Sequence, residues 1–352
     1  MFPNSAHREI IDLLQQRASE NDVLIVPKTA DNVTGTSARV SRAEWVLLLL
    51  LLLLGFSLRL WQISSVGLDH LDEGVYVLSA LGVSDPGQPY RLYPTQFRFS
   101  PPTYFALVAL CYQALGAPSD FAAVLANVFL GTLTIAAVWW VGRAWFGPQA
   151  GIAAAALVTL SEYHIALSRT ALTDVGFVLF FFLALGLIAV ALQRASTGLA
   201  VLAGIAVGIS WNTKYHGWFA LVIAGLALLP YAYIYRARGL ALARLLLLFM
   251  VISGVAVICY LPWALFVQGQ PGGYAALLQY ERTLIDGHWR TNLILQAQNQ
   301  LFSEGPLTRV SIAVAFLCAT LVSPRALGSG PRFLLALIFV CLAALLLGGA
   351  GT

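Results

Sequence analysis

Charged residues are scarce in this chain. They make up 10% of its 352 residues, whereas hydrophobic residues make up 59%. A soluble domain carries about 25% charged residues, so the composition excludes an ordinary soluble globular protein. The net charge of +4 is small and does not point to a nucleic-acid partner. The informative property is how these few charges are distributed across a membrane.

Cysteine is also sparse, and no two cysteines have the short spacing of a metal or redox motif. A metal site or a disulfide framework therefore finds no support, and buried free thiols are favoured. No secretory signal peptide is expected, because the first apolar run begins near Trp45 and is long enough to span a bilayer. The four cysteines are Cys111, Cys259, Cys318 and Cys341.

Long apolar runs are abundant. A helix that crosses a bilayer needs about 20 apolar residues, and such runs recur along the chain. We therefore predict an all-α polytopic membrane helix bundle of about nine spanning helices. The predicted spans are 45–61, 121–141, 150–168, 174–192, 199–213, 217–235, 245–267, 307–323 and 333–350. A shorter run, 101–116, opens with two prolines, and we predict that it lies flat on the membrane.

The distribution of charge supports this topology through the positive-inside rule. With a cytoplasmic N-terminus and a flat run 101–116, the inner loops carry seven arginines and no acidic residue. If that run spanned instead, Arg236, Arg238 and Arg244 would face outward. The seven arginines are Arg143, Arg194, Arg236, Arg238, Arg244, Arg325 and Arg332. The ten acidic residues after Glu44 fall in or near outer segments: Asp69, Asp72, Glu73, Asp85, Asp120, Glu162, Asp174, Glu281, Asp286 and Glu304.

The predicted organisation has three parts. Residues 1–44 form a polar cytoplasmic segment. Residues 45–240 form the main membrane module and include a large outer loop, 62–120. Residues 241–352 form the C-terminal membrane helices with a second outer loop, 268–306. We expect a cell membrane protein whose active site faces the periplasmic or extracellular side.

Ionisable groups near apolar spans usually line a functional cavity, and the first such cluster is an acidic turn at 68–74. Asp72 and Glu73 are adjacent, and two carboxylates held together suit acid–base chemistry. An ordinary solvated turn is the alternative. Together with Asp69 they are also candidates for a divalent metal ion, although no complete ligand set is evident.

The second cluster lies between the predicted spans 150–168 and 174–192. Glu162 and Arg169 are seven residues apart, so on a continuous helix they would share a face. Asp174 opens the next span, where the helix dipole alone would also favour a carboxylate. Arg169 has the alternative of snorkelling to the interface. His164 lies between them in the chain.

The third and fourth clusters supply cations. Residues 211–217 form a tight turn in which Lys214 suits a phosphate or diphosphate anion; an interfacial lysine in an aromatic belt is the alternative. His216 is interpreted mainly as a belt or hydrogen-bonding residue. In the segment 280–290, arginines beside aromatic residues suit a lipid phosphate or an acceptor, and a solvated surface helix is equally compatible.

All these clusters fall on the predicted outer side. An acid pair, an arginine–aspartate junction and a lysine turn facing one pocket suit glycosyl transfer from a lipid phosphate. The base would deprotonate the acceptor, and the cations would stabilise the leaving phosphate.

Five motifs, in order, resemble the GT-C glycosyltransferases, in particular the bacterial branch related to protein O-mannosyltransferases and the lipid A aminoarabinose transferase. The resemblance covers about residues 45–240. The motifs are Asp72-Glu73, Ser100-Pro101-Pro102-x-Tyr104, Gly142-Arg143-x-x-Phe146-Gly147, Ser168-Arg169 with Asp174, and Thr213-Lys214-Tyr215.

The resemblance implies two juxtamembrane helices in the first outer loop and a polyprenyl-phosphate-linked sugar donor. It implies that Asp72 is the catalytic base, that Glu73 supports it, and that Asp174 is a second catalytic aspartate. Lys214, with Arg169 and Tyr215, is expected to bind the donor phosphate. The weaker candidates for acceptor or lipid contacts are Arg98, His164, His216 and Arg282.

Two departures from the family keep other hypotheses open. Relatives commonly place a histidine or a Glu-Lys pair before the prolines, where this chain has Phe99-Ser100, and this chain ends directly after its last predicted span. A truncated inactive GT-C scaffold is therefore one alternative. A transporter or flippase of lipid-linked sugar is another, although neither inverted halves nor inward-facing ionisable groups within the spans are apparent.

Overall fold

The computed structural model describes residues 40–84, 100–235 and 242–283, together with 291, 294, 295 and 298. Every regular element in these ranges is helical, so the all-α prediction is confirmed for the described part. The predicted spans 307–323 and 333–350 lie outside the described residues, as does most of the polar segment 1–44.

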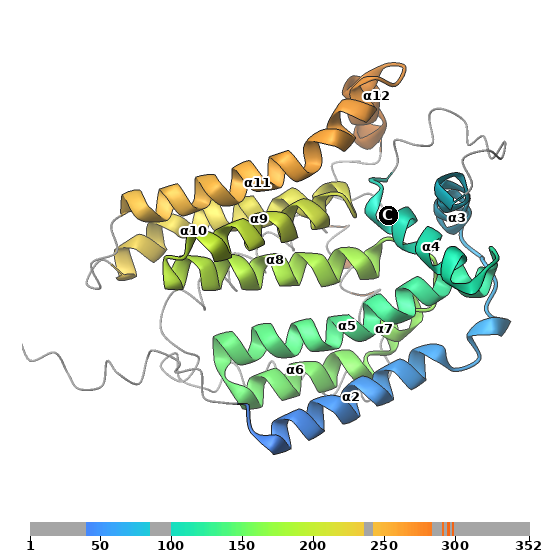
Figure 1. The fold of residues 1–352 in the computed structure, drawn as a ribbon, viewed down its shortest axis with the longest axis horizontal. Helices are drawn as coiled ribbons and strands as arrows, with labels where there is room; N and C mark the ends of the chain where they lie inside the picture. The colour runs from blue at the N-terminus through green and yellow to red at the C-terminus, as the bar shows by residue number, and fades with distance from the viewer. Residues whose placement is uncertain are drawn as a thin grey trace, which may run out of the picture. The chain divides into compact units, whose positions relative to one another are not determined.

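Seven helices form the body of the bundle (Figure 1). One group consists of α2, α5 and α6, which pack on one another, and α5 joins it to α8. The second group is built by α8 on α9, α9 on α11, and α10 on α11. The helices are α2 (Arg42–Leu60), α5 (Asp120–Phe146), α6 (Pro148–Leu160), α8 (Asp174–Arg194), α9 (Thr197–Trp211), α10 (Phe219–Tyr235) and α11 (Leu242–Gln268).

Four of the described helices are long and apolar enough to cross a membrane: Arg42–Ser65, Asp120–Ala144, Asp174–Arg194 and Leu242–Gln268. The chain is therefore a multi-pass membrane protein. The apolar helices Pro148–Leu160, Thr197–Trp211 and Tyr215–Leu226 are shorter. At about 1.5 Å per residue, 13 residues reach only about 20 Å of a hydrocarbon core of about 30 Å. The total of nine spans stays a prediction.

The predicted span 150–168 is not one continuous helix. It breaks at Ser161 into α6 and the short helix α7 (Glu162–Leu167). Ser161 has an extended backbone, and its hydroxyl accepts the amide of His164, so it caps a new helix rather than continuing α6. Because α7 ends at Leu167, the prediction that Glu162 and Arg169 share a face of one helix is wrong.

Two further helices, α3 (Leu71–Ser84) and α4 (Thr103–Leu115), lie at one end of the bundle, beyond the end of α8 (Figure 1). They pack on each other, and α4 also packs on α5. Tyr104 is fully buried and meets Tyr76 of α3 edge to face, with the ring centroids 5.9 Å apart. Helix α4 thus packs at one end of the bundle, and its placement on a membrane surface stays a prediction.

Two hydrophobic cores hold these elements. One gathers residues of α8, α9, α10 and α11, and the other gathers residues of α3, α4 and α5 with the first turns of α8. Helix α8 therefore belongs to both cores. Its first turns pack in the second core with residues of α3, and its first residue, Asp174, pairs with Lys214, which follows α9. We call this end of the bundle, which contains the first turns of α3 and α8, the site end.

The opposite end, which we call the far end, contains the first turn of α2 and the last turn of α5. There the Nε of Arg143 lies 2.6 Å from Oε1 of Glu44, and the same oxygen accepts the indole N–H of Trp139 at 3.2 Å. Arg244 also lies at the far end, where its Nη2 donates to the backbone carbonyl of Ala195 that ends α8. Buried polar groups are thus satisfied at this end within the protein.

Candidate functional site

Glu73 is a buried carboxylate in the first turn of α3, with 2% of its surface exposed. Its Oε2 accepts the backbone amides of Asp69 at 3.0 Å and His70 at 2.9 Å. Its Oε1 accepts the amide of Ala171 at 2.6 Å, a residue 98 positions later in the chain. A carboxylate suits the first turn of a helix, because the free amides and the helix dipole favour negative charge there. Glu73 therefore ties the acidic turn to the segment 168–173 that precedes α8.

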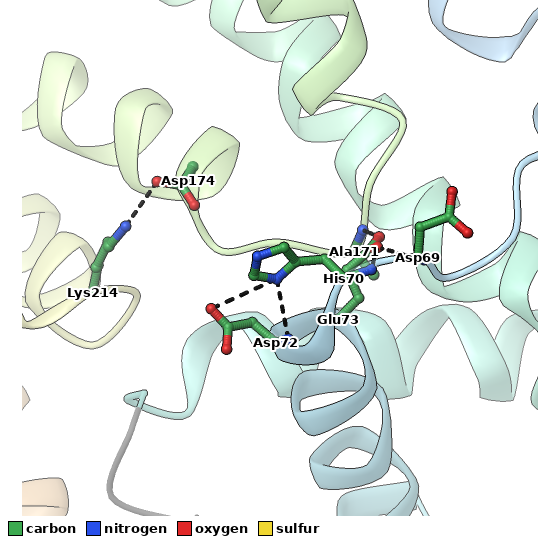
Figure 2. A network of polar contacts seen from close by, with 7 residues as sticks. All are labelled: Asp69, His70, Asp72, Glu73, Ala171, Asp174 and Lys214. Atoms are coloured by element: carbon green, nitrogen blue, oxygen red, sulfur yellow. Dashed lines mark hydrogen bonds and ion pairs between the residues drawn. The ribbon is translucent and has the colours of Figure 1, made fainter. Parts of the chain in front are cut away.

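Asp72 differs from its neighbour because its carboxylate is 55% exposed. Its backbone amide donates to Nδ1 of His70 at 3.2 Å, and its Oδ2 lies 3.8 Å from the same nitrogen. Figure 2 shows the Asp72 side chain projecting toward the side where Asp174 and Lys214 lie, whereas Asp69 points the other way. Of these two aspartates, Asp72 is the one directed toward the other ionisable groups of the site end.

Asp174 and Lys214 form an ion pair, with 2.7 Å between Lys214 Nζ and Asp174 Oδ1. Asp174 is the first residue of α8, and Lys214 follows α9 immediately before the 3-10 helix η4 (Tyr215–Trp218). This turn requires Gly217, where any side chain would overlap the backbone of Ser210 and Trp211. The pair remains accessible, since the side chains are 41% and 35% exposed respectively.

Arg59, in the last turn of α2, is a buried cation that sequence reasoning missed. No part of its surface is exposed. Its Nη1 and Nη2 donate to the carbonyls of Gly55 and Val158, and its Nε donates to the Ser168 hydroxyl. Nη2 also lies 2.8 Å from Nδ1 of His164. A charged residue inside a predicted span was the available signal.

His164 lies on α7, beyond the end of α6, and is one of the weaker site candidates from the sequence. Burial and the neighbouring Arg59 lower the pKa of His164 to about 3. The imidazole is therefore neutral near pH 7, and its Nδ1 can accept the guanidinium N–H. Its Nε2 is buried without a hydrogen-bond partner among the described residues. This position fits an internal contact more closely than a substrate contact.

The segment 168–173 joins α7 to α8 and carries Arg169. The Arg169 Nε is buried and finds no acceptor within the described ranges. The segment is also held by Asn127 of α5, whose Nδ2 donates to the carbonyls of Thr170 at 2.6 Å and Leu172 at 2.7 Å. Asn127 is fully buried and is a second residue that sequence reasoning missed, although an amide within an apolar span was visible.

An apolar cavity of about 700 Å³ lies next to the Lys214 turn, between α4, α9 and α11. Its position is set by α4, whose first amide, that of Thr103, donates to the carbonyl of Asn212 at 2.9 Å. Asn212 also donates to the carbonyl of Cys259 on α11. The lining residues are Pro102, Thr103, Ala106, Leu107, Ile209, Asn212, Cys259, Pro262, Trp263 and Phe266.

Two aromatic candidates lie around this cavity and turn. The Tyr215 hydroxyl accepts the indole N–H of Trp263, a lining residue, at 3.3 Å. His216 is exposed and stacks on Phe219, with the ring centroids 5.9 Å apart. The remaining candidates lie outside what the structure describes: Arg98 entirely, and Arg282 with its side chain, although its backbone belongs to α12 (Gly273–Thr283).

The carboxylates of the acidic turn do not point toward one position, as the ligands of a metal ion would. Both oxygens of Glu73 are engaged by backbone amides, and Asp69 and Asp72 point to different sides (Figure 2). Within the described ranges, no group of three or more histidine, cysteine, aspartate or glutamate side chains could hold a metal ion. The candidate ligands from the sequence therefore do not fit one metal site.

Comparison with known proteins identifies the fold. Residues 100–266 match the sequence model of the family described as dolichyl-phosphate-mannose-protein mannosyltransferase. Over these residues, which make up a little under half of the chain, the sequence is similar to this family of glycosyltransferases. The matched segment includes Asp174 and Lys214, and the resemblance to GT-C glycosyltransferases is thereby confirmed. A comparison with curated proteins found no match.

Several solved structures have a similar fold. ArnT from Cupriavidus metallidurans, bound to undecaprenyl phosphate, has a TM-score of 0.63 at 18% identity, covering 89% of this chain and 57% of that one. The archaeal oligosaccharyltransferase AglB from Archaeoglobus fulgidus, in complex with an inhibitory peptide and a dolichol-phosphate, has a TM-score of 0.54 at 18% identity, covering 87% and 37%. The Pmt1-Pmt2 complex of S. cerevisiae, bound to the sugar donor, has a TM-score of 0.52 at 16% identity, covering 72% and 37%. The chain thus spans between about a third and three fifths of the length of these structures.

Proposed function

We propose that the protein is a membrane glycosyltransferase. It transfers a sugar from a polyprenyl-phosphate-linked donor to a lipid, glycan or protein acceptor on the non-cytoplasmic side. One observation carries this proposal: an exposed carboxylate, Asp72, lies at the same end of the bundle as an accessible ion pair, Asp174–Lys214, beside an apolar cavity. These are the parts that transfer from a lipid-borne phosphate requires.

The proposed reaction uses Asp72 as the general base. Its carboxylate accepts the proton of the acceptor hydroxyl while the acceptor oxygen attacks the anomeric carbon of the donor sugar. The bond from that carbon to the phosphate oxygen breaks with inversion, and polyprenyl phosphate leaves. Lys214 and Arg169 stabilise the negative charge that develops on the leaving phosphate, while Asp174 orients the lysine ammonium. Glu73 supports the base by fixing the turn that presents it.

Replacement of Asp72 by Asn tests this assignment. Loss of a general base typically costs a factor of about 10² to 10⁴, so transfer from a polyprenyl-phosphate sugar in membranes should fall by at least about a hundredfold. Asp69→Asn is the matched control, because it removes the same charge from the same turn on a side chain that points elsewhere. Unchanged turnover of Asp72→Asn would remove this residue from the mechanism.

The donor's isoprenoid chain is proposed to occupy the apolar cavity between α4, α9 and α11. Its lining offers apolar side chains close to the Lys214 turn, so a lipid tail seated there would bring its phosphate toward the ammonium group. Cys259 lines the cavity, whereas Cys111 is also partly buried but lies on α4 outside the lining. Undecaprenyl phosphate should slow alkylation of Cys259 and leave Cys111 unaffected. Equal protection of both thiols, or of neither, would count against this placement.

The non-cytoplasmic placement of the site is part of the proposal. Arg143, Arg194 and Arg244 all lie toward the far end, which the positive-inside rule assigns to the cytoplasm. Cysteines introduced singly at Ala117, in the loop before α5, and at Gln149, at the start of α6, report on the two ends, since both positions are exposed. In a cysteine-free background, a membrane-impermeant maleimide applied outside should label only position 117. Labelling of position 149 alone would show that the protein has the opposite orientation in the membrane.

No observation favours the transporter hypothesis over transfer. The accessible ionisable groups described above lie at the ends of the bundle, whereas alternating access places its substrate site near the bilayer midplane. Translocation of lipid-linked sugar in proteoliposomes without acceptor, and without any transfer product when acceptor is added, would nevertheless establish it. A protein that binds polyprenyl phosphate but neither transfers nor translocates the sugar would be the inactive scaffold.

A further inference from the structure

Three consecutive residues before α8 have their backbone groups bonded to side chains from two other helices. Asn127 of α5 donates to the carbonyls of Thr170 and Leu172 at 2.6 and 2.7 Å. Between them, the amide of Ala171 donates to Glu73 of α3 at 2.6 Å. The backbone of this segment is thus held by the carboxamide of Asn127 and the carboxylate of Glu73.

The carboxamide orientation follows from its partners. Both acceptors are carbonyl oxygens, so the nitrogen of Asn127, which carries two N–H donors, must face them. The side chain is fully buried within the apolar core of α3, α4 and α5. Buried carbonyls that lose their donors are costly, and among the described residues the side chain of Asn127 is the donor that both carbonyls share.

Residues of the proposed donor site lie both before and after residues 170–172 in the chain. Arg169 stands immediately before Thr170, and its Nε is buried without a partner among the described residues. Asp174 follows two residues after Leu172 and pairs with Lys214. A change in the conformation of residues 170–172 would therefore shift the guanidinium and the ion pair together. The Asp72 carboxylate lies on α3, and α3 contacts this segment through the hydrogen bond from the Ala171 amide to Glu73.

We infer that Asn127 is a positioning residue for the donor phosphate: its carboxamide fixes the segment 168–173 so that Arg169 and the Asp174–Lys214 pair face one anion. Asn127 does not touch the substrate. This inference rests on the proposed function. In it, Asn127 of α5 sets the affinity for the donor, whereas Asp72 of α3 is the general base.

Kinetics separate this role from a merely structural one. Asn127→Ala should raise the KM for the polyprenyl-phosphate sugar by about tenfold, which corresponds to the loss of one well-placed interaction, and should leave kcat within about threefold. Asp72→Asn should instead lower kcat. Thr134→Val is the matched control, because Thr134 is also buried on α5 but its hydroxyl donates to the carbonyl of Leu130 in the same helix. Its KM should equal that of the wild type.

Two measurements without turnover complete the test. Amide hydrogen exchange of Asn127→Ala should accelerate in the peptide that covers 168–174 and not in peptides of α9 or α11. Binding of undecaprenyl phosphate alone should weaken by the same factor as KM rises. If Asp72→Asn were fully active, the proposed mechanism would fail, yet these two measurements would still decide the role of Asn127.

An unchanged donor KM together with faster exchange at 168–174 would overturn the inference. Faster exchange throughout the bundle, with activity lost only in proportion to the unfolded fraction, would also overturn it and would leave Asn127 as a stabilising residue. If the alanine variant does not fold, Asn127→Gln replaces it. That variant keeps both N–H donors on a longer arm, so a raised KM supports positioning and a wild-type KM contradicts it.

Discussion

The two ends of the bundle each hold an ion pair, and the pairs differ in their access to solvent. At the far end, Arg143 and Glu44 are only 17% and 7% exposed, and the glutamate oxygen also accepts from Trp139. At the site end, Lys214 and Asp174 are 35% and 41% exposed. Chemically similar pairs therefore serve different purposes: the buried pair holds α2 on α5, whereas the accessible pair remains available to an anion.

Energetics support this division. Removing one partner of a buried pair leaves an uncompensated charge and costs about 3–5 kcal/mol. A pair as exposed as Asp174–Lys214 contributes about 0–1 kcal/mol to stability. Variants at the far end should therefore change unfolding, and variants at the site end should change activity. Each prediction below tests one side of this comparison.

The largest effect is expected from Lys214→Met, which removes the proposed phosphate cation while keeping an apolar side chain of similar length. Loss of one group that stabilises developing negative charge typically costs a factor of about 10² to 10³ in rate, so transfer activity should fall by that amount. The thermal unfolding midpoint in detergent should remain close to that of the wild type. Lys214→Arg, which keeps the charge, is the control and should retain a larger share of the activity.

The far-end pair should behave in the opposite way. Glu44→Ala removes a buried carboxylate that both Arg143 and Trp139 contact, so the free energy of unfolding should fall by about 3–5 kcal/mol. The double variant Glu44→Leu with Arg143→Met replaces both charges by apolar groups and should recover most of that loss. Thermal unfolding measures the stability, and kcat per folded molecule should not change. Loss of kcat in the folded fraction would show that the far end also contributes to the reaction.

Two glycines offer a smaller test of the same comparison. A Cβ at Gly151, at the start of α6, would lie 2.7 Å from the carbonyl oxygen of Trp139, and one at Gly217 would overlap the backbone of the last turn of α9. Overpacking of this kind typically costs about 1–3 kcal/mol, so both alanine variants should unfold at lower temperature. Only Gly217→Ala should also raise the donor KM, because it shifts the turn that carries Lys214. An equal KM in the two variants would contradict this.

Most of the bundle could be predicted from the sequence, because hydropathy and charge act locally. The seven described helices of the body coincide with the first seven predicted spans, and Asp72, Asp174 and Lys214 were identified as candidates that the structure brings to one end. The prediction failed at Ser161, where a side chain that accepts an amide ended a helix inside a continuous apolar run. Local capping overrode hydropathy at that position.

Arg59 and Asn127 could not be interpreted from the sequence, because their partners are distant in the chain. Ser168 lies 109 positions after Arg59, and Thr170 lies 43 positions after Asn127. In a hydropathy average over a span, each of these polar residues only lowers the mean value slightly. Only the packed structure shows that both side chains donate hydrogen bonds to the same short segment, 168–173, before α8. The pairing of Glu73 with Ala171 was hidden for the same reason.

The smallest expected effect concerns pH and the buried His164. Because the pKa of His164 in the folded protein is lowered to about 3, only the unfolded state binds a proton at this residue as pH falls below about 6.5. Stability should therefore decline on acidification between about pH 6.5 and pH 3. His164→Asn keeps an acceptor for Arg59 but removes the titration, so its unfolding midpoint should fall less between pH 7 and pH 5. Identical pH profiles of the wild type and His164→Asn would mean that His164 does not contribute to the acid sensitivity of the fold.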